Sequence, residues 1–151
     1  MKILVSACLL GRNCKYDGGN NFRQNVVDFL RGHEVVEVCP EVMAGRSIPR
    51  KPIELLNGKF IEEDGTDVDA QVRRGVQDAL EIARAEKIDL AILKSRSPTC
   101  GVRQIYDGTF SGKLIPGKGI TTKKLESLGV KVINEDEAKE LLKSLEEKNP
   151  A

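Results

Sequence analysis

Four cysteines are the side chains of this sequence best suited to chemistry: Cys8, Cys14, Cys39 and Cys100. Cys8 and Cys39 each come shortly after a predicted strand, at residues 2–6 and 34–38, and Cys100 lies in the loop after a third, at residues 88–93. Parallel strands end at one edge of a sheet, and ligands bind outside that edge. We therefore expect these three thiols to converge there, with their sulfurs about 4–7 Å apart, and Cys14 to lie in a flexible loop at the same edge.

The residues around the cysteines limit the kinds of site that the thiols can form. Free cysteines are often no more than small buried apolar side chains, but three that stand just beyond strands favour a site. The one histidine, His33, precedes the strand at residues 34–38, while Cys39 follows it, which places the two about 20 Å apart. A Cys–His nucleophilic pair and a mixed Cys/His zinc site are therefore disfavoured, and no Cys-x-x-Cys motif is present. His33 is best interpreted as an ordinary loop histidine.

Several thiolates without histidine suit an iron–sulfur cluster or an all-cysteine zinc site. A structural zinc ion would take all four thiolates, whereas a cluster held by three of them would leave one iron open to substrate. The spacing of the cysteines does not separate these two kinds of site. An enzyme, a non-enzymatic module that holds zinc or a cluster, and a thiol-based redox protein all stay open at this point.

Other polar residues are predicted at the same edge. Glu41 follows Cys39 across Pro40, and Ser97 leads into Cys100, so either could move a proton there or simply be a solvated loop residue. The Pro-Arg-Lys-Pro sequence at residues 49–52 is a stiff basic loop that either holds an anion or is solvated.

A third segment of interest, residues 117–122, runs into a helix whose first N–H groups could hold anions or carbonyl oxygens. It is not a Walker A loop, and no Gly-x-Gly-x-x-Gly motif follows the first strand. Functions that hydrolyse nucleotides or bind dinucleotides therefore have little support.

Charge and composition limit the partners. The 24 basic residues balance 23 acidic ones, so the net charge is +1, which argues against binding nucleic acid or membranes by bulk charge. No run of about 18 apolar residues is present, and the first residues are too few and lack the cleavage pattern for a signal peptide. We therefore expect a cytoplasmic protein with reduced thiols. Its 151 residues suit one domain, predicted over residues 1–146, with residues 147–151 as a frayed C-terminal tail.

The elements that must position these residues follow from the apolar pattern. Strands are predicted at residues 2–6, 34–38, 88–93 and 130–133, and the first of them is an apolar run typical of a buried strand. Residues 53–56 and 59–62 flank Asn57-Gly58, which predicts a small β-hairpin. Residues 95–119 are expected to form a long functional loop. Tyr-Asp-Gly occurs twice, at residues 16–18 and 106–108, and each copy is interpreted as a turn.

Helices are predicted between the strands and towards the C-terminus. They span residues 22–30, 67–86, about 121–128 and an amphipathic stretch around 138–145. Asp67 or Thr66 is expected to cap the second helix, and Thr121 or Thr122 the third. Strands that alternate with helices predict an α/β fold, a three-layer sandwich around a mainly parallel sheet that is Rossmann-like or flavodoxin-like, with the small hairpin added.

A series of short motifs runs through the chain in order. They are Ser6-Ala7-Cys8-Leu9-Leu10-Gly11, Cys14-Lys15-Tyr16-Asp17-Gly18, Cys39-Pro40-Glu41, Pro49-Arg50-Lys51-Pro52, Gly65-Thr66-Asp67-Val68, Leu93-Lys94-Ser95-Arg96-Ser97-Pro98-Thr99-Cys100-Gly101, Ile105-Tyr106-Asp107-Gly108-Thr109-Phe110-Ser111-Gly112 and residues 117–122. Together they resemble the thiouracil desulfidase family of iron–sulfur proteins, formerly described as a domain of unknown function. The resemblance extends over residues 1–135, nearly the whole chain.

This resemblance implies an enzyme with a 4Fe–4S cluster, bound by three cysteines so that the fourth iron stays free. The free iron would take the sulfur of a small thiolated pyrimidine, and water would replace that sulfur, giving uracil from thiouracil with hydrogen sulfide and no net redox change. By position, the family's proton-transferring glutamate and serine correspond to Glu41 and Ser97. The strand-end argument selects Cys8, Cys39 and Cys100 as cluster ligands, and Cys14 is the alternative.

Overall fold

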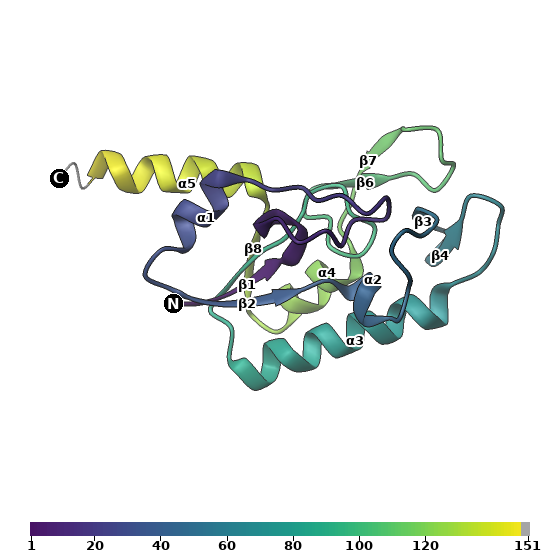
Figure 1. The fold of residues 1–151 in the computed structure, drawn as a ribbon, viewed down its shortest axis with the longest axis horizontal. Helices are drawn as coiled ribbons and strands as arrows, with labels where there is room; N and C mark the ends of the chain where they lie inside the picture. Colours follow the sequence, from purple (N-terminus) through teal and green to yellow (C-terminus); the bar gives the residue numbers. More distant parts are fainter. Residues whose placement is uncertain (149–151) are drawn as a thin grey trace.

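The structure, a computed structural model, describes residues 1–148, and its centre is a sheet of four parallel strands (Figure 1). The strands lie in the order β2-β1-β5-β8. They are β1 (Lys2–Ser6), β2 (Glu34–Val38), β5 (Leu90–Ile92) and β8 (Lys131–Ile133). Every neighbouring pair is parallel, so the carboxyl ends of all four strands share one edge, as predicted.

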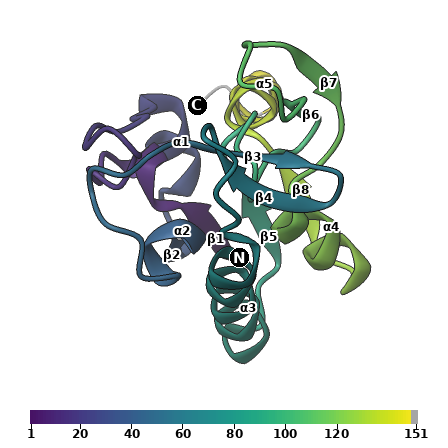
Figure 2. The ribbon, with the colours of Figure 1, turned by 90° about the vertical axis from the view of Figure 1, so that its right-hand side faces the viewer.

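Helices cover both faces of this sheet (Figure 2). They are α1 (Gln24–Leu30), α3 (Asp69–Glu86), α4 (Ile120–Ser127) and α5 (Glu135–Lys148). Side chains of β1 alternate between the faces, because Ile3 and Val5 belong to the core that α1 and α5 cover, whereas Leu4 belongs to the core under α3 and α4. The predicted three-layer α/β sandwich is confirmed. Among residues 1–148, no helix has the length and apolar character needed to cross a membrane.

The predicted hairpin is also present. β3 (Ile53–Leu56) pairs antiparallel with β4 (Lys59–Glu62). Asn57 and Gly58 have positive φ angles of 51° and 78°, as the two central residues of a type I′ turn require. Phe60 of this hairpin is fully buried in the core under α3.

The segment 95–119 contains a second hairpin, so the prediction of a loop is wrong for part of it. β6 (Gln104–Tyr106) pairs antiparallel with β7 (Leu114–Pro116). Each strand has three residues, too few for a period-two pattern to stand out. Two short helices are likewise absent from the sequence-based prediction: the 3-10 helix η1 (Ala7–Leu10) after β1, and α2 (Pro40–Met43) after β2.

The first turn of α3 differs from its prediction by two residues. The helix begins at Asp69, and the preceding Val68 makes no side-chain cap. Asp67 comes nearest to the predicted role, because its Oδ1 accepts the N–H of Asp69 at 2.9 Å. Thr66 donates its hydroxyl to Asp64 instead, at 2.7 Å.

The predicted threonine cap of α4 is wrong. The helix begins at Ile120, directly after Gly119. Thr121 and Thr122 are both fully buried in its first turn. The hydroxyl of Thr122 donates to the carbonyl oxygen of Cys100 at 2.9 Å, so it bonds a neighbouring loop rather than the helix start.

Other ends of elements differ by one or two residues. β5 covers residues 90–92 of the predicted 88–93, and β8 covers 131–133 of the predicted 130–133. α5 continues through Lys148, so residues 147 and 148 of the predicted tail are helical. The rest of that tail, residues 149–151, lies outside the described residues.

Gly75 lets α2 lie directly against α3. A Cβ atom on Gly75 would stand 2.0 Å from the carbonyl oxygen of Pro40 and 2.7 Å from the nitrogen of Ala44. Both of these are backbone atoms, which a side chain cannot push aside without moving α2. The packing therefore fixes the helix that carries Glu41 at the carboxyl edge of the sheet.

We expect Gly75→Ala to lower the free energy of unfolding by about 1–3 kcal/mol, because the added methyl group must displace α2. This loss would occur although alanine is the better helix former by about 1 kcal/mol. Urea unfolding measures the difference. Gln77→Ala, at an exposed position of the same helix, is the control and should change stability by less than about 0.5 kcal/mol. A Gly75→Ala variant as stable as the wild type would contradict the close packing.

Candidate functional site

All four cysteines line one cavity of about 580 Å³ at the carboxyl edge of the sheet. Cys8 lies in η1 after β1, Cys39 between β2 and α2, and Cys100 in the loop after β5. Cys14 lies between η1 and α1, and all four thiols are free. The chain leaves β1 towards β2 on one side and leaves β5 towards β8 on the other, so these two connections run apart. The crevice between them is the usual ligand site of such sheets. The structure thus brings the four predicted thiols together.

Cys14 lies at the centre of the thiol group. Cys39 Sγ donates to the carbonyl oxygen of Cys14 at 3.9 Å. Interaction with the thiols of Cys39 and Cys8 raises the pKa of the buried Cys14. The interaction with Cys14 lowers the pKa of Cys39 to about 7 and lowers the pKa of Cys8. The three thiols therefore influence one another's titration.

Cys100 is more buried than the other three cysteines, with 3% of its surface exposed. This burial raises the pKa of its thiol to about 12. The charges of Cys39 and Cys8 make smaller contributions in the same direction. Thr99 Oγ1 donates to the Cys100 sulfur at 3.6 Å.

The start of α4 supports the Cys100 loop. The N–H of Gly119 donates to the carbonyl of Gly101 at 2.7 Å, and the N–H of Thr121 donates to that of Thr99 at 2.9 Å. A Cβ atom on Gly119 would stand 2.4 Å from the Thr99 carbonyl oxygen, so glycine is needed for this approach. The sequence predicts that the N–H groups at this helix start hold either anions or carbonyl oxygens. In the structure they bind carbonyl oxygens of the protein itself.

Glu41 and Arg50 form a buried ion pair beside the cavity. Their side chains are 14% and 4% exposed. Arg50 Nε donates to Glu41 Oε1 at 3.3 Å, and Arg50 Nη2 donates to the carbonyl oxygen of Cys14 at 2.8 Å. Within residues 1–148, Glu41 Oε2 accepts no hydrogen bond. The two basic residues of the predicted loop therefore have different surroundings. Arg50 binds a buried carboxylate beside the cavity, whereas the exposed Lys51 pairs with Asp64 at 3.2 Å.

Ser97 reaches the cavity at the turn before Cys100. Its Oγ accepts the N–H of Cys100 at 3.1 Å and lies 3.2 Å from Thr99 Oγ1. Since Thr99 Oγ1 also contacts the Cys100 sulfur, two hydroxyl groups connect the cavity wall to a thiol. Sequence reasoning overlooks Thr99, because nothing in Ser-Pro-Thr-Cys distinguishes its hydroxyl from that of an ordinary loop threonine.

Lys94 places a cation beside the thiols. It lines the cavity, and its charge adds a smaller contribution to the lowered pKa of Cys8 after the contact with Cys14. Lys94 Nζ lies 3.0 Å from Oε2 of Glu135, which also accepts the hydroxyl of Ser95 at 2.9 Å. These partners come from different elements, so the sequence alone does not pair them.

The chain matches the 2-thiouracil desulfurase family over residues 3–137. It belongs to this family. It is 36% identical over 150 residues to the uncharacterized protein YbbK of Bacillus subtilis (strain 168), covering 93% of this chain and 99% of that one. Its structure is similar to that of the 4Fe–4S-dependent thiouracil desulfidase TudS, with a TM-score of 0.86 at 41% identity, covering 95% of this chain and 97% of the other. The resemblance drawn from the motifs is confirmed.

The donor atoms in this member of the 2-thiouracil desulfurase family suit an iron–sulfur cluster. Thiolates are the usual ligands of such clusters, and four thiols from three connections of the fold line one cavity here. The residues present therefore fit a cluster.

The two Tyr-Asp-Gly copies of this desulfurase-family chain are turns, as predicted. Asp17 Oδ1 accepts the N–H of Gly19 at 2.9 Å, and Asp107 Oδ1 accepts that of Thr109 at 3.0 Å. The glycines of both copies have positive φ, 83° and 93°. Each turn brings its tyrosine to the cavity, where a third aromatic residue also lies; the three are Tyr16, Tyr106 and Phe110.

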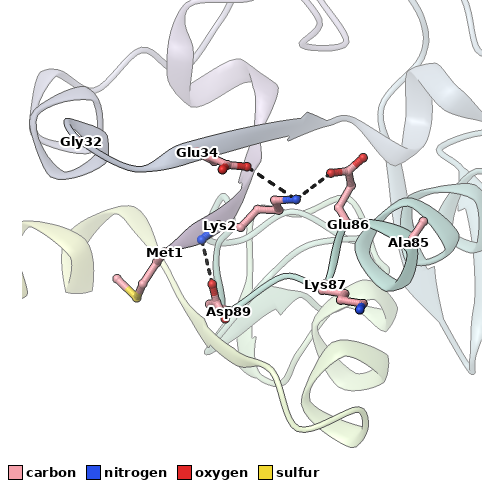
Figure 3. Close-up of a pocket in the computed structure, with 8 residues that line it drawn as sticks. All are labelled: Met1, Lys2, Gly32, Glu34, Ala85, Glu86, Lys87 and Asp89. Atoms are coloured by element: carbon pink, nitrogen blue, oxygen red, sulfur yellow. Dashed lines mark hydrogen bonds and ion pairs between the residues drawn. The ribbon is translucent and has the colours of Figure 1, made fainter.

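A second pocket lies at the opposite edge of the sheet (Figure 3). Lys2 Nζ pairs there with Glu34 at 3.5 Å and with Glu86 at 3.1 Å. His33 is at this edge too, with Nδ1 3.1 Å from the terminal nitrogen of Met1. It lies a strand's length from Cys39, as the sequence predicts, and the Lys2 ammonium of this pocket is already paired with two carboxylates.

Proposed function

We propose that this chain is an iron–sulfur-dependent desulfidase of thiolated pyrimidines, which converts thiouracil and water to uracil and hydrogen sulfide. Water supplies the oxygen that replaces sulfur on the ring carbon, and its two hydrogens leave with the sulfur, so no oxidant or reductant is needed. The observation that carries the proposal is the cavity in which four thiols meet Glu41 and Ser97. Its support is the similarity to a protein described as a 4Fe–4S-dependent thiouracil desulfidase.

Cys8, Cys39 and Cys100 are the residues that would hold the cluster. Each follows one of three neighbouring strands, and their thiols line the cavity. Cys14 would be the thiol of the cavity that binds no iron. When bound through three thiolates, the cluster supplies an open iron for a soft sulfur atom, and this Lewis acid polarises the carbon–sulfur bond.

Glu41 is the candidate general base. Arg50 holds Oε1, which fixes the orientation of the carboxylate and leaves Oε2 to accept a proton from water in the cavity. Its place two residues after Cys39, in the first turn of α2, keeps it beside the thiol group.

Ser97 is the candidate proton donor. The N–H of Cys100 holds its oxygen at the cavity wall, and Thr99 supplies a second hydroxyl at 3.2 Å. Ser97 could therefore donate a hydrogen bond to the ring or pass a proton to the departing sulfur.

The substrate would be a small molecule. A cavity of about 580 Å³ is of the size that small ligands occupy, and aromatic side chains in its lining suit a flat ring. The net charge of +1 offers no bulk attraction for nucleic acid. We propose a cytoplasmic location, where the four free thiols would stay reduced.

Protein purified without oxygen tests this function. We expect a brown protein with broad absorption near about 400 nm, iron and acid-labile sulfide in equal amounts, and sulfide release from 2-thiouracil or 4-thiouracil. A colourless protein that contains zinc would support the non-enzymatic metal module instead. A brown protein that releases no sulfide from either base would contradict the proposed reaction.

The ligand assignment predicts unequal effects of four substitutions. Cys8→Ser, Cys39→Ser and Cys100→Ser should each abolish cluster binding, because a cluster with one open iron has no ligand to spare. Cys14→Ser should retain the cluster. Iron content and visible absorption of the four variants measure this. Cluster loss in Cys14→Ser together with retention in Cys8→Ser would show that the ligand set is wrong.

Glu41→Gln should keep the shape of the side chain and remove the base. We expect this variant to remain folded and brown, to bind thiouracil, and to release sulfide at least about 100-fold more slowly. The loss should appear in kcat rather than in KM. Ser97→Ala should also lose rate while it keeps the cluster, and Glu140→Gln, at an exposed position of α5, is the control. Sulfide release by Glu41→Gln at nearly the normal rate would remove Glu41 from the mechanism.

A further inference from the structure

Glu54 is a buried acid in the cavity wall for which the reaction above has no use. It lies in β3, is 8% exposed and lines the cavity with the cysteines. Within residues 1–148 it forms no ion pair, since both of its hydrogen bonds come from backbone N–H groups. A buried carboxylate without a cation is costly to maintain, so its presence calls for a further partner.

Both hydrogen bonds of Glu54 fall on the same oxygen. Oε1 accepts the N–H of Gly108 at 2.9 Å and that of Phe110 at 3.2 Å. The loop that carries these groups lies directly on β3, because a Cβ atom on Gly108 would stand 2.9 Å from the carbonyl oxygen of Leu55. Two backbone N–H groups of this loop therefore hold the carboxylate in one orientation.

The second oxygen of Glu54 is free. Oε2 accepts no hydrogen bond from the described residues, and it is not among their buried polar atoms that are both sealed from solvent and without a partner. Oε2 therefore keeps contact with solvent, and the cavity of the cysteines is the space that Glu54 lines. An ionised carboxylate only accepts hydrogen bonds, so a matching ligand must bring a donor.

We propose that Glu54 Oε2 accepts a ring N–H of the bound pyrimidine and so determines which thiolated bases the site takes. This inference rests on the proposed function for the identity of the ligand. Uracil-type rings carry N–H groups beside their carbonyl and thiocarbonyl groups, and these are the donors that a fixed carboxylate can recognise. A ring with an unprotonated nitrogen at that place would set a lone pair against the carboxylate and be rejected.

Methylation of the ring nitrogens tests the assignment. Wild type and Glu54→Gln are titrated with 2-thiouracil and with its N1-methyl and N3-methyl derivatives, and binding is measured by calorimetry alongside sulfide release. Glutamine can still accept the N–H groups of Gly108 and Phe110 through its amide oxygen, but it presents an NH2 group in place of Oε2. We expect one methyl derivative to bind wild type at least about 10-fold more weakly than thiouracil. Glu54→Gln should bind thiouracil at least about 10-fold more weakly and should no longer distinguish that derivative.

Glu63→Gln is the matched control, because it removes an exposed carboxylate from the lining of the same cavity and leaves the Gly108 loop untouched. It should retain the wild-type preference for thiouracil over the methyl derivative. Circular dichroism checks the fold of each variant. If Glu54→Gln does not fold, Glu54→Asp, which keeps the charge and withdraws it from the ring, takes its place in the same series.

Two results would overturn the role of Glu54 alone. In one, wild type releases sulfide and binds thiouracil and both methyl derivatives equally, so no ring N–H is recognised. In the other, Glu54→Gln weakens all three ligands by the same factor, so Glu54 only holds the loop. If wild type neither binds a thiolated pyrimidine nor releases sulfide from one, the proposed function fails, and the role of Glu54 fails with it.

Discussion

The side chain of Arg50 holds together loops that have little regular structure of their own. Its guanidinium donates to Glu41 in α2, to the carbonyl oxygen of Cys14 and, at 3.4 Å, to that of Ser47. Its backbone N–H donates to the carbonyl of Tyr16 at 2.7 Å. Loops around a cavity cannot satisfy their backbone polar groups by strand pairing, so they need bonds of this kind. A planar cation with five donors can serve several such acceptors at once.

The burial of Arg50 in turn depends on Glu41. A buried cation needs hydrogen-bond acceptors around it, and Glu41 Oε1 supplies one of the three that the guanidinium has. The pair therefore couples the α2 acid to the loop that carries Cys14. On the other side of the cavity, backbone contacts replace the ion pair, because Gly119 brings the start of α4 against the loop of Cys100. One wall of the site is thus held by charge and the other by close approach of the backbone.

Features that depend on neighbours in the sequence could be predicted, and features that depend on distant partners could not. Strand β1 contains an apolar run, β2 is rich in valine, and the Asn57-Gly58 turn needs positive φ at two adjacent residues, so the sequence identifies all three. The meeting of the cysteines follows from the shared edge of parallel strands. By contrast, Glu41 of α2 pairs with Arg50, which lies nine positions away in a loop. Glu54 of β3 accepts the N–H of Gly108, which lies 54 positions away. No local pattern marks such pairs, and the three-residue strands β6 and β7 are too short to show one.

Two acidic residues of the cavity, Glu41 and Glu54, each have one carboxylate oxygen bonded by the protein, but the groups that bind it differ. Glu41 has one oxygen held by a guanidinium, and Glu54 has one oxygen held by two backbone N–H groups, so each presents a single free oxygen. Arg50 holds one oxygen of Glu41 in α2, two residues after Cys39, which suits a group that must meet water beside the thiols. Backbone donors hold Glu54 in one orientation, which suits a group that recognises a donor at a fixed place on a ligand. The different supports therefore favour proton transfer at Glu41 and recognition at Glu54 within the same cavity.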